Sequence, residues 1–186
     1  MGIKAQKKKL AGKKPIIAAI DFSGHSEAVL LWAYQYAKLM KLPMIALHIV
    51  HEPADEPGFY KRERNGQLTP MKEVARKMLG AFIQTCSDNH PEYPKLGKIS
   101  TLLIKGLPVK RILTVAKKLD ASTIVMGSKG RTGLPYLFLG SKAEEVVNKA
   151  QVPVVIVKIP NEDVGDETAE VQTGQEQEIN STDDQP

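Results

Sequence analysis

The chain has 186 residues, of which 42% are hydrophobic and 25% charged, and its net charge is +5. This length predicts one domain with extensions, and the single cysteine, Cys86, excludes an internal disulfide and a cysteine-based metal site. Neither a run of about 18 apolar residues nor the apolar stretch of a secretory signal is present, so we expect a cytoplasmic protein without a membrane span.

The two ends of the chain differ in charge. Residues 1–14 contain six lysines and no acidic residue, and we expect a flexible basic arm. Residues 161–186 contain nine Asp and Glu but no Lys or Arg, and we expect an acidic, disordered tail. Without the nine charges of the tail, the net +5 becomes +14 on residues 1–160. Such a surface can attract nucleotides, nucleic acid or anionic lipid, but solvated ends are the simpler explanation, and we do not expect a nucleic acid partner.

Apolar runs then alternate with helical patterns, which is typical of βαβ units. Residues 15–21 predict the first strand, and Ser23 is placed to cap a helix over residues 25–41 that should be largely buried. The second strand is expected at residues 44–51. The polar stretch 52–68 is too long for a simple connector.

Thr69 and Pro70 predict the start of the next helix, which runs to about residue 89. This alternation of strands and helices predicts a Rossmann-like α/β fold. Its five-stranded parallel sheet should be open and doubly wound, with strand order 3-2-1-4-5 and helices on both faces. Ligands of such sheets bind at the carboxyl ends of the strands, where the strand order reverses. The remaining elements are strands at 98–105, 122–126 and 152–158 and helices that begin at Pro108 and Ser141.

The most informative segment is a buried strand that ends in glycine, a glycine-bearing loop and a Gly-Ser step that opens a helix. Gly127 and Gly130 are three residues apart, nine residues follow, and Gly140 then precedes Ser141. Glycine lets an anion approach the backbone, and a helix N-terminus attracts phosphate. The spacing is neither that of a Walker A loop nor that of a dinucleotide fingerprint. The segment predicts a phosphate site.

Each part of this segment also has a purely structural explanation. The first two glycines can form an ordinary strand-exit turn, and Ser141 with Glu144 can form a capping box. Lys129, Arg131 and Lys142 lie in or beside the motif and could offset the charge of a triphosphate, or they could simply be solvated.

The spacing G-x2-G-x9-G-S resembles the phosphate-binding motif of the ATP-binding branch of the universal stress protein family. Segments 16–23, 47–50 and 152–157 resemble the family's first, second and last strands, so the likeness covers about residues 15–160. The resemblance implies a regulatory ATP-binding protein of the stress response. It also implies a homodimer. A divalent metal such as Mg or Mn could accompany the phosphates.

Three residues are candidates for the nucleoside side of the site. Asp21 ends the first strand, where a carboxylate can accept from ribose hydroxyls, and the resemblance implies this role. A charge at a helix N-terminus is the alternative. Ile49 and Met126 would form the apolar wall around adenine, with the backbone near Ile49 pairing with the base, or would be plain sheet core.

The sequence offers no convincing nucleophile or base, so we do not expect an enzyme beyond a weak ATPase. His48 is expected to be a satisfied core histidine, and His25 and His51 lack metal-ligand spacing. One alternative is a nucleotidyl or phosphoryl transferase on a related fold, although its His-x-Gly-His and Lys-Met-Ser-Lys-Ser motifs are absent. Another is a nucleotide-independent interaction module with an unidentified protein partner.

The last strand predicts how two copies would assemble. Residues 152–157 are almost wholly apolar, and Pro153 suits an edge strand because it donates no ladder hydrogen bond. An exposed apolar edge favours aggregation unless it is covered. A two-fold copy of the same strand would cover it in an antiparallel pair.

Overall fold

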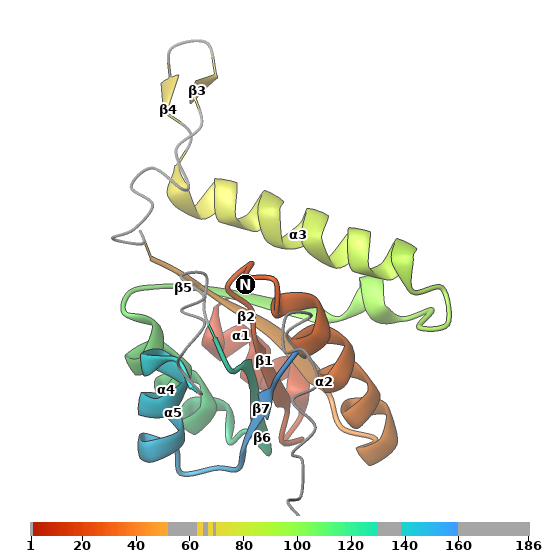
Figure 1. The fold of residues 1–186 in the computed structure, drawn as a ribbon, viewed down its shortest axis with the longest axis vertical. Helices are drawn as coiled ribbons and strands as arrows, with labels where there is room; N and C mark the ends of the chain where they lie inside the picture. Colours follow the sequence, from red (N-terminus) through yellow and green to blue (C-terminus); the bar gives the residue numbers. More distant parts are fainter. Residues whose placement is uncertain (1, 52–62, 65–66, 69, 130–138, 160–186) are drawn as a thin grey trace, which may run out of the picture.

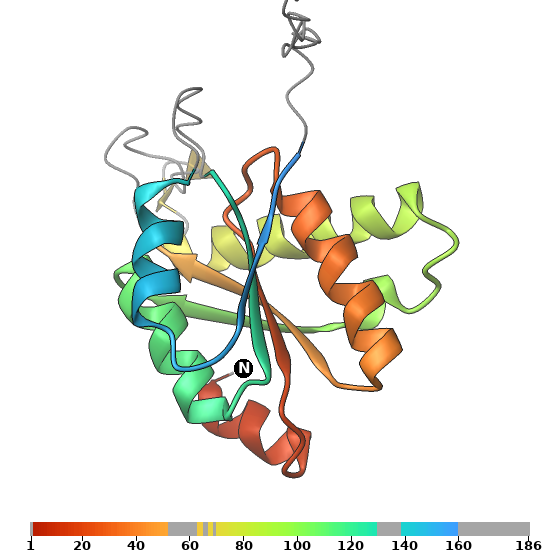
Figure 2. The same ribbon diagram turned by 60° about the horizontal axis from the view of Figure 1, so that its bottom comes forward.

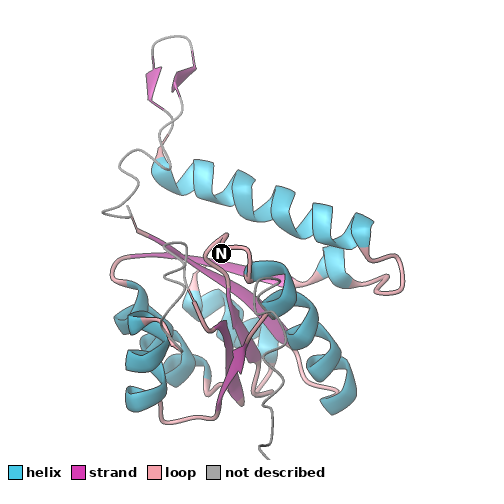
Figure 3. Ribbon diagram, in the orientation of Figure 1, coloured by secondary structure: helices cyan, strands magenta, loops and turns pink. Residues whose placement is uncertain are grey.

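The computed structural model describes residues 2–51, 63–64, 67–68, 70–129 and 139–159. A five-stranded parallel sheet lies between two layers of helices (Figures 1 and 3). Its strands are β1 (Ile16–Ala19), β2 (Met44–Val50), β5 (Ser100–Lys105), β6 (Thr123–Gly127) and β7 (Val154–Val157). The described helices are α1 (Ile3–Leu10), α2 (Ser26–Met40), α3 (Met71–Asn89), α4 (Pro108–Leu119) and α5 (Ser141–Lys149), with a short 3-10 turn, η1 (Leu96–Lys98).

The strand order is β5-β2-β1-β6-β7. Counted along the chain within this sheet, this is 3-2-1-4-5, so the predicted doubly wound fold is confirmed. The central strands form because they are continuous apolar runs, which suits strands that are covered on both faces. All seven residues of β2 are buried, for example. A separate antiparallel pair, β3 (Glu63–Arg64) and β4 (Gln67–Leu68), lies within the segment that is too long for a simple connector.

The two faces of the sheet have separate cores. Ile16 and Ala18 of β1 pack with α2 and α3, whereas Ile17 packs with α1, α4 and α5, because successive side chains of a strand point to opposite faces. Figure 2 shows α2 on one side of β7 and α5 on the other. Helices therefore cover both faces of the sheet, as a doubly wound topology requires.

The prediction of a flexible arm at residues 1–14 is wrong for most of its length, because residues 3–10 form α1, which packs on α4. Gln6 and Leu10 are buried and Ile3 packs on the same core, while the lysines are exposed. Gln6 Nε2 also donates to the carbonyl of Thr101 in β5 over 3.0 Å. The six lysines obscured this helix because only three residues form its inward face.

Two expectations for α2 also need correction. Ser23 does not cap the helix: His25 occupies the N-cap position, and none of the described side chains caps the helix there. The helix buries one face only, through residues such as Ala33 and Ala37. Its outward surface exposes three large apolar side chains, those of Trp32, Leu39 and Met40.

Candidate functional site

The carboxyl ends of β1 and β6 form the rim where the chain order reverses. These two strands are neighbours in the sheet, with Ile16 opposite Thr123 and Ala18 opposite Val125. From β1 the chain builds outward through β2 and β5, and it then crosses back to β6 and β7 on the other side. Such a switch point is the usual ligand position of an open α/β sheet. Asp21 follows β1 at this rim.

Asp21 organises the turn that leads into α2. Its Oδ1 accepts hydrogen bonds from the backbone N–H of Ser23 and from the Oγ–H of Ser26, both over 3.0 Å. Ser26 is buried, whereas Asp21 is exposed. No described residue donates to the second oxygen, Oδ2. One oxygen of Asp21 therefore fixes the turn, and the other remains an acceptor at the rim.

The backbone of this turn is strained, and a histidine supports it. Phe22 has φ +63°, which is unusual for an aromatic residue. Its ring packs on that of His48 with 4.4 Å between centroids. Buried His48 lies with Nδ1 2.7 Å from the carbonyl oxygen of Ile20. A carbonyl only accepts, so Nδ1 carries the hydrogen. His48 is thus a satisfied core histidine, as predicted.

The end of β6 leaves no room for a side chain at Gly127. A Cβ at this position would lie 2.9 Å from the Cβ of His25 and 3.3 Å from the carbonyl oxygen of Lys129. The first distance is shorter than real Cβ atoms show, so any larger residue would displace His25. In the sequence, His25 shows neither metal-ligand spacing nor any sign of this contact, because the two residues are about a hundred positions apart.

A backbone hydrogen bond joins the two ends of the glycine loop. The N–H of Gly140 donates to the carbonyl of Ser128 over 2.7 Å, and the N–H of buried Ser128 donates to Val157 in β7 over 2.9 Å. The first and last parts of the glycine motif therefore meet at the end of β6. Gly130 and Arg131 lie outside the described residues.

Helix α5 begins at Ser141, as predicted, but the capping box is wrong. Gly140 occupies the N-cap position, and no side chain in the described part of the protein caps the helix. The N–H of Glu144 donates to the Gly140 carbonyl, as in any helix. Gly140 has φ −69° and ψ 147°, which any residue can adopt. Because Ser141 and Lys142 stand in the first turn, their amides have no acceptor within the helix and can bind an anion.

The structure thus brings Gly127, Lys129, Gly140, Ser141 and Lys142 together at the rim beside β1. Ile49 and Met126 are buried beneath this rim, in the core shared with α4 and α5. Their burial agrees with the alternative in which both residues belong to the sheet core. Their contact with a base stays a prediction.

Among the residues that the structure describes, cysteine and metal chemistry offer no competing site. In the described ranges, no three His, Cys, Asp or Glu side chains gather to hold a metal ion. Burial raises the pKa of the Cys86 thiol to about 11, and the negative charge of Glu27 adds to this effect. A thiol with this pKa is protonated at neutral pH and is a poor nucleophile. None of the described helices is both long and apolar enough to cross a membrane.

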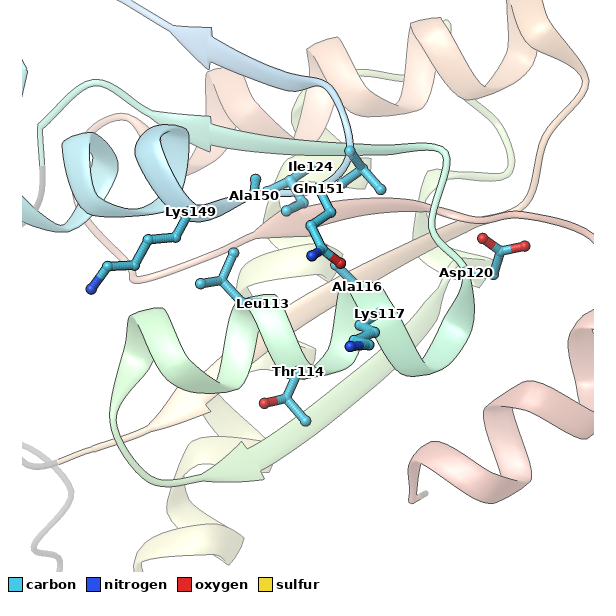
Figure 4. A pocket seen from close by; sticks show the side chains of 10 residues that line it. Leu113, Thr114, Ala116, Lys117, Asp120, Ile124, Lys149, Ala150 and Gln151 are labelled. Atoms are coloured by element: carbon cyan, nitrogen blue, oxygen red, sulfur yellow. The ribbon is translucent and has the colours of Figure 1, made fainter.

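A groove of about 360 Å³ lies at the opposite end of the sheet, between α4 and the connection from α5 to β7 (Figure 4). Ile124 and Val152 contribute to its lining near the amino ends of their strands. None of the sequence-predicted site residues lines it. Two of its charged residues already have partners: Asp120 pairs with Lys14 over 3.1 Å, and Lys149 pairs with Glu145. The groove therefore gives no specific indication of a ligand.

The family model of the Universal stress protein family matches residues 13–158. The chain belongs to the universal stress protein family. Universal stress protein MJ0577 of Methanocaldococcus jannaschii is 27% identical over 160 residues, which cover 80% of this chain and 96% of that protein. Universal stress protein MJ0531 of the same organism is 44% identical over 66 residues, which cover 36% of this chain but only 39% of that protein.

Solved structures of universal stress proteins share the fold. A structure of MJ0577 superposes with a TM-score of 0.56 at 26% identity and covers 80% of this chain and 98% of that one. The universal stress protein of Archaeoglobus fulgidus in complex with dAMP gives a TM-score of 0.51 at 22% identity and covers 78% of this chain and 98% of that one. The second likeness is a likeness of fold alone.

Proposed function

We propose that this universal stress protein is a regulatory ATP-binding module that acts as a homodimer in a stress response and has at most slow hydrolysis. One observation carries the proposal: the hydrogen bond from Gly140 to Ser128 joins the two ends of the glycine motif at the switch point of the sheet. The Archaeoglobus fulgidus protein with the same fold binds dAMP, which supports an adenine nucleotide as the ligand.

The phosphates would lie at the N-terminus of α5. The first-turn amides there, including those of Ser141 and Lys142, have no intrahelical acceptor, and the Ser141 hydroxyl can donate as well. Lys129, Arg131 and Lys142 would offset phosphate charge. A divalent ion such as Mg or Mn would be held mainly by the phosphates and water, since this ion needs no protein cage in such sites.

The nucleoside would lie across the rim toward β1. Asp21 uses Oδ1 to fix its own turn, which leaves Oδ2 to accept from a ribose hydroxyl. One carboxylate would then both hold the turn after β1 and bind the ribose. The base would then lie over the carboxyl ends of β2 and β6, where Ile49 and Met126 would provide an apolar floor.

The homodimer would form through the strand of residues 152–157. At the opposite edge of the sheet, side chains already bond to backbone carbonyls of β5: Gln6 to Thr101, and Arg111 Nε to Lys105 over 3.0 Å. Strand β7 forms the other edge, and its four residues are only half-buried. A second copy related by a two-fold axis would pair with β7 in antiparallel fashion and cover its apolar side chains.

Mass spectrometry of the purified protein, denatured without added nucleotide, tests the ligand directly. We expect ATP to be released in nearly stoichiometric amount, or ATP to bind with a heat signal if purification removes it. A protein that releases no nucleotide and binds no ATP in calorimetry would favour the nucleotide-independent interaction module.

A further inference from the structure

Helix α2 carries a largely exposed apolar surface outside the proposed nucleotide site, and of its four residues Tyr36 is half-buried against the sheet core. We define the α2 ridge as Trp32, Tyr36, Leu39 and Met40, which share one side of the helix at spacings of three and four residues. Trp32 is 37% exposed, Met40 49% and Leu39 77%. The rings of Trp32 and Tyr36 pack with 5.0 Å between centroids.

The ridge faces the β7 side of the molecule. On the opposite flank of α2, Tyr34 packs on Tyr93 with 5.3 Å between centroids, and Gln35 donates to the Tyr93 hydroxyl. Tyr93 follows α3, which contacts β2 and β5, whereas α2 contacts β1 and β6 most and reaches β2 on one side and β7 on the other. The flank that carries the ridge therefore points away from α3, toward the sheet edge formed by β7, which Figure 2 shows beside α2.

The strand at this edge continues the apolar surface. Val155 and Val157 point to the same face of the sheet as α2 and pack against its core, yet both are only half-buried. Contiguous apolar surface of this kind is rare on soluble monomers and marks contact sites.

We propose that the α2 ridge belongs to the homodimer interface and faces the same ridge of a second copy across paired β7 strands. This inference rests on the proposed homodimer. A two-fold axis that pairs β7 antiparallel in one continuous sheet stands perpendicular to that sheet. It leaves both α2 helices on the same face, one on each side of the paired strands, with their ridges turned toward each other.

The spacing explains why the ridge is aromatic. The two α2 helices would be separated by three to four strand spacings, about 14–19 Å. Directly packed helices are about 8–10 Å apart, so small side chains could not close this gap. Long side chains such as Trp32 and Tyr36 can extend across it and cover Val155 and Val157. Moreover, a pair of four-residue strands alone falls short of the roughly 1,200–2,000 Å² that stable interfaces bury, so a further contact is needed.

The chain contains a single tryptophan, so its fluorescence reports on Trp32 alone. We expect the emission maximum of the full-length protein to shift to shorter wavelength as concentration rises from nanomolar to tens of micromolar. The midpoint should match the dissociation constant of the dimer from sedimentation. An emission maximum that stays constant while the protein dimerises would overturn the inference.

Substitutions on the ridge provide the second arm. The double variant Leu39→Lys, Met40→Lys should raise the dissociation constant of the dimer at least tenfold, and lysines near the end of α2 are compatible with the helix dipole. Leu107→Lys is the matched control, because this leucine is 63% exposed but precedes α4. Val155→Lys tests β7 pairing itself. An unchanged dimer in the ridge variant, with Val155→Lys monomeric, refutes only the ridge. A wild-type monomer at all these concentrations refutes the homodimer and the ridge contact together.

Discussion

The backbone amide of Gly140 donates to the carbonyl of Ser128 over 2.7 Å. This contact closes the glycine loop at its base, where Ser128 is itself tied to β7 through Val157. It uses the Gly140 amide, which therefore cannot serve a phosphate at the same time. The amides that remain for an anion are those of the first turn of α5.

Gly140→Val should weaken ATP binding more than tenfold, about 1.4 kcal/mol, because branched carbons would occupy space beside the phosphates. The fold should survive, since Gly140 has φ −69°, which valine can adopt. Gly80→Ala in α3 is the matched control: a Cβ at this position would meet nothing within 4 Å, so ATP affinity should not change. Calorimetry with ATP measures both. Equal affinities for wild type and Gly140→Val would remove the loop from the site.

Asp21 has two roles that different substitutions can separate. Asp21→Asn keeps an Oδ1 acceptor for Ser23 and Ser26 and should leave the free energy of unfolding nearly unchanged. Asp21→Ala loses both bonds and should cost about 0.5–2 kcal/mol, as the loss of a helix cap does. Both should weaken ATP binding, because neither offers a second carboxylate oxygen. Urea unfolding and calorimetry provide the two readouts, and wild-type affinity in Asp21→Asn would refute the ribose contact.

ATP turnover should be slow, below about 1 s⁻¹ in the steady state, which is the lower end of ordinary enzyme rates. The physical reason is that neither candidate group is activated: burial in the core raises the pKa of the Cys86 thiol to about 11, and His48 is bonded to a backbone carbonyl. Gly140→Val, purified in the same way, gives the background from contaminating ATPases. A faster rate that this variant loses would support the transferase or hydrolase alternative.

The stability of the fold should depend on pH through His90, which bridges α2 and the segment after α3. Hydrogen bonds to Glu27 and Glu92, at 2.9 and 3.2 Å, raise the pKa of His90 above its ordinary 6.5. A raised pKa in the folded state means that the protonated form stabilises the fold. This contribution is complete below about pH 6.5 and is lost as the pH rises through the raised pKa.

The pKa of Glu92 is lowered, mainly by a backbone hydrogen bond and also by His90, so its carboxylate stays ionised over this range. The thermal midpoint of the wild type should therefore fall from pH 6 to pH 9 more than that of His90→Asn. Parallel pH profiles for the two proteins would contradict a stabilising role for this pair of contacts. The effect should be small, because these groups lie at the surface.

The dimer edge can be tested from both faces of β7. Val155 packs toward α2, and Ile156 packs toward the core that α5 covers. Val155→Lys and Ile156→Asp should each give a monomer in sedimentation at micromolar concentration, where we expect the wild type to be a dimer. Both variants should still bind ATP, which shows that they fold. A dimer that persists in both would place the interface elsewhere.

The fold class can be predicted from the sequence because it depends on apolar and helical patterns within single segments of the chain. The apolar runs of β1, β2 and β6 require cover on both faces, and the helical patterns between them supply it, which leaves the doubly wound sheet as the simplest arrangement. The start of α5 at Ser141 is also predictable, since Gly-Ser before a helical pattern is a local signal. The glycine spacing predicts the loop, but its contacts with a nucleotide stay a prediction.

Other features depend on residues that meet only when the chain folds. The lysines of residues 1–14 suggest a solvated arm, but Gln6 and Leu10 find partners on β5 and α4, and these contacts outweigh the local charge. Ser23 and Ser141 have the right residue type for helix caps, yet His25 and Gly140 occupy the N-cap positions. His25 lies against Gly127 because β1 and β6 are adjacent in the sheet. Residue type determined the elements and their order, whereas the pairing of distant strands decided which side chains share the rim.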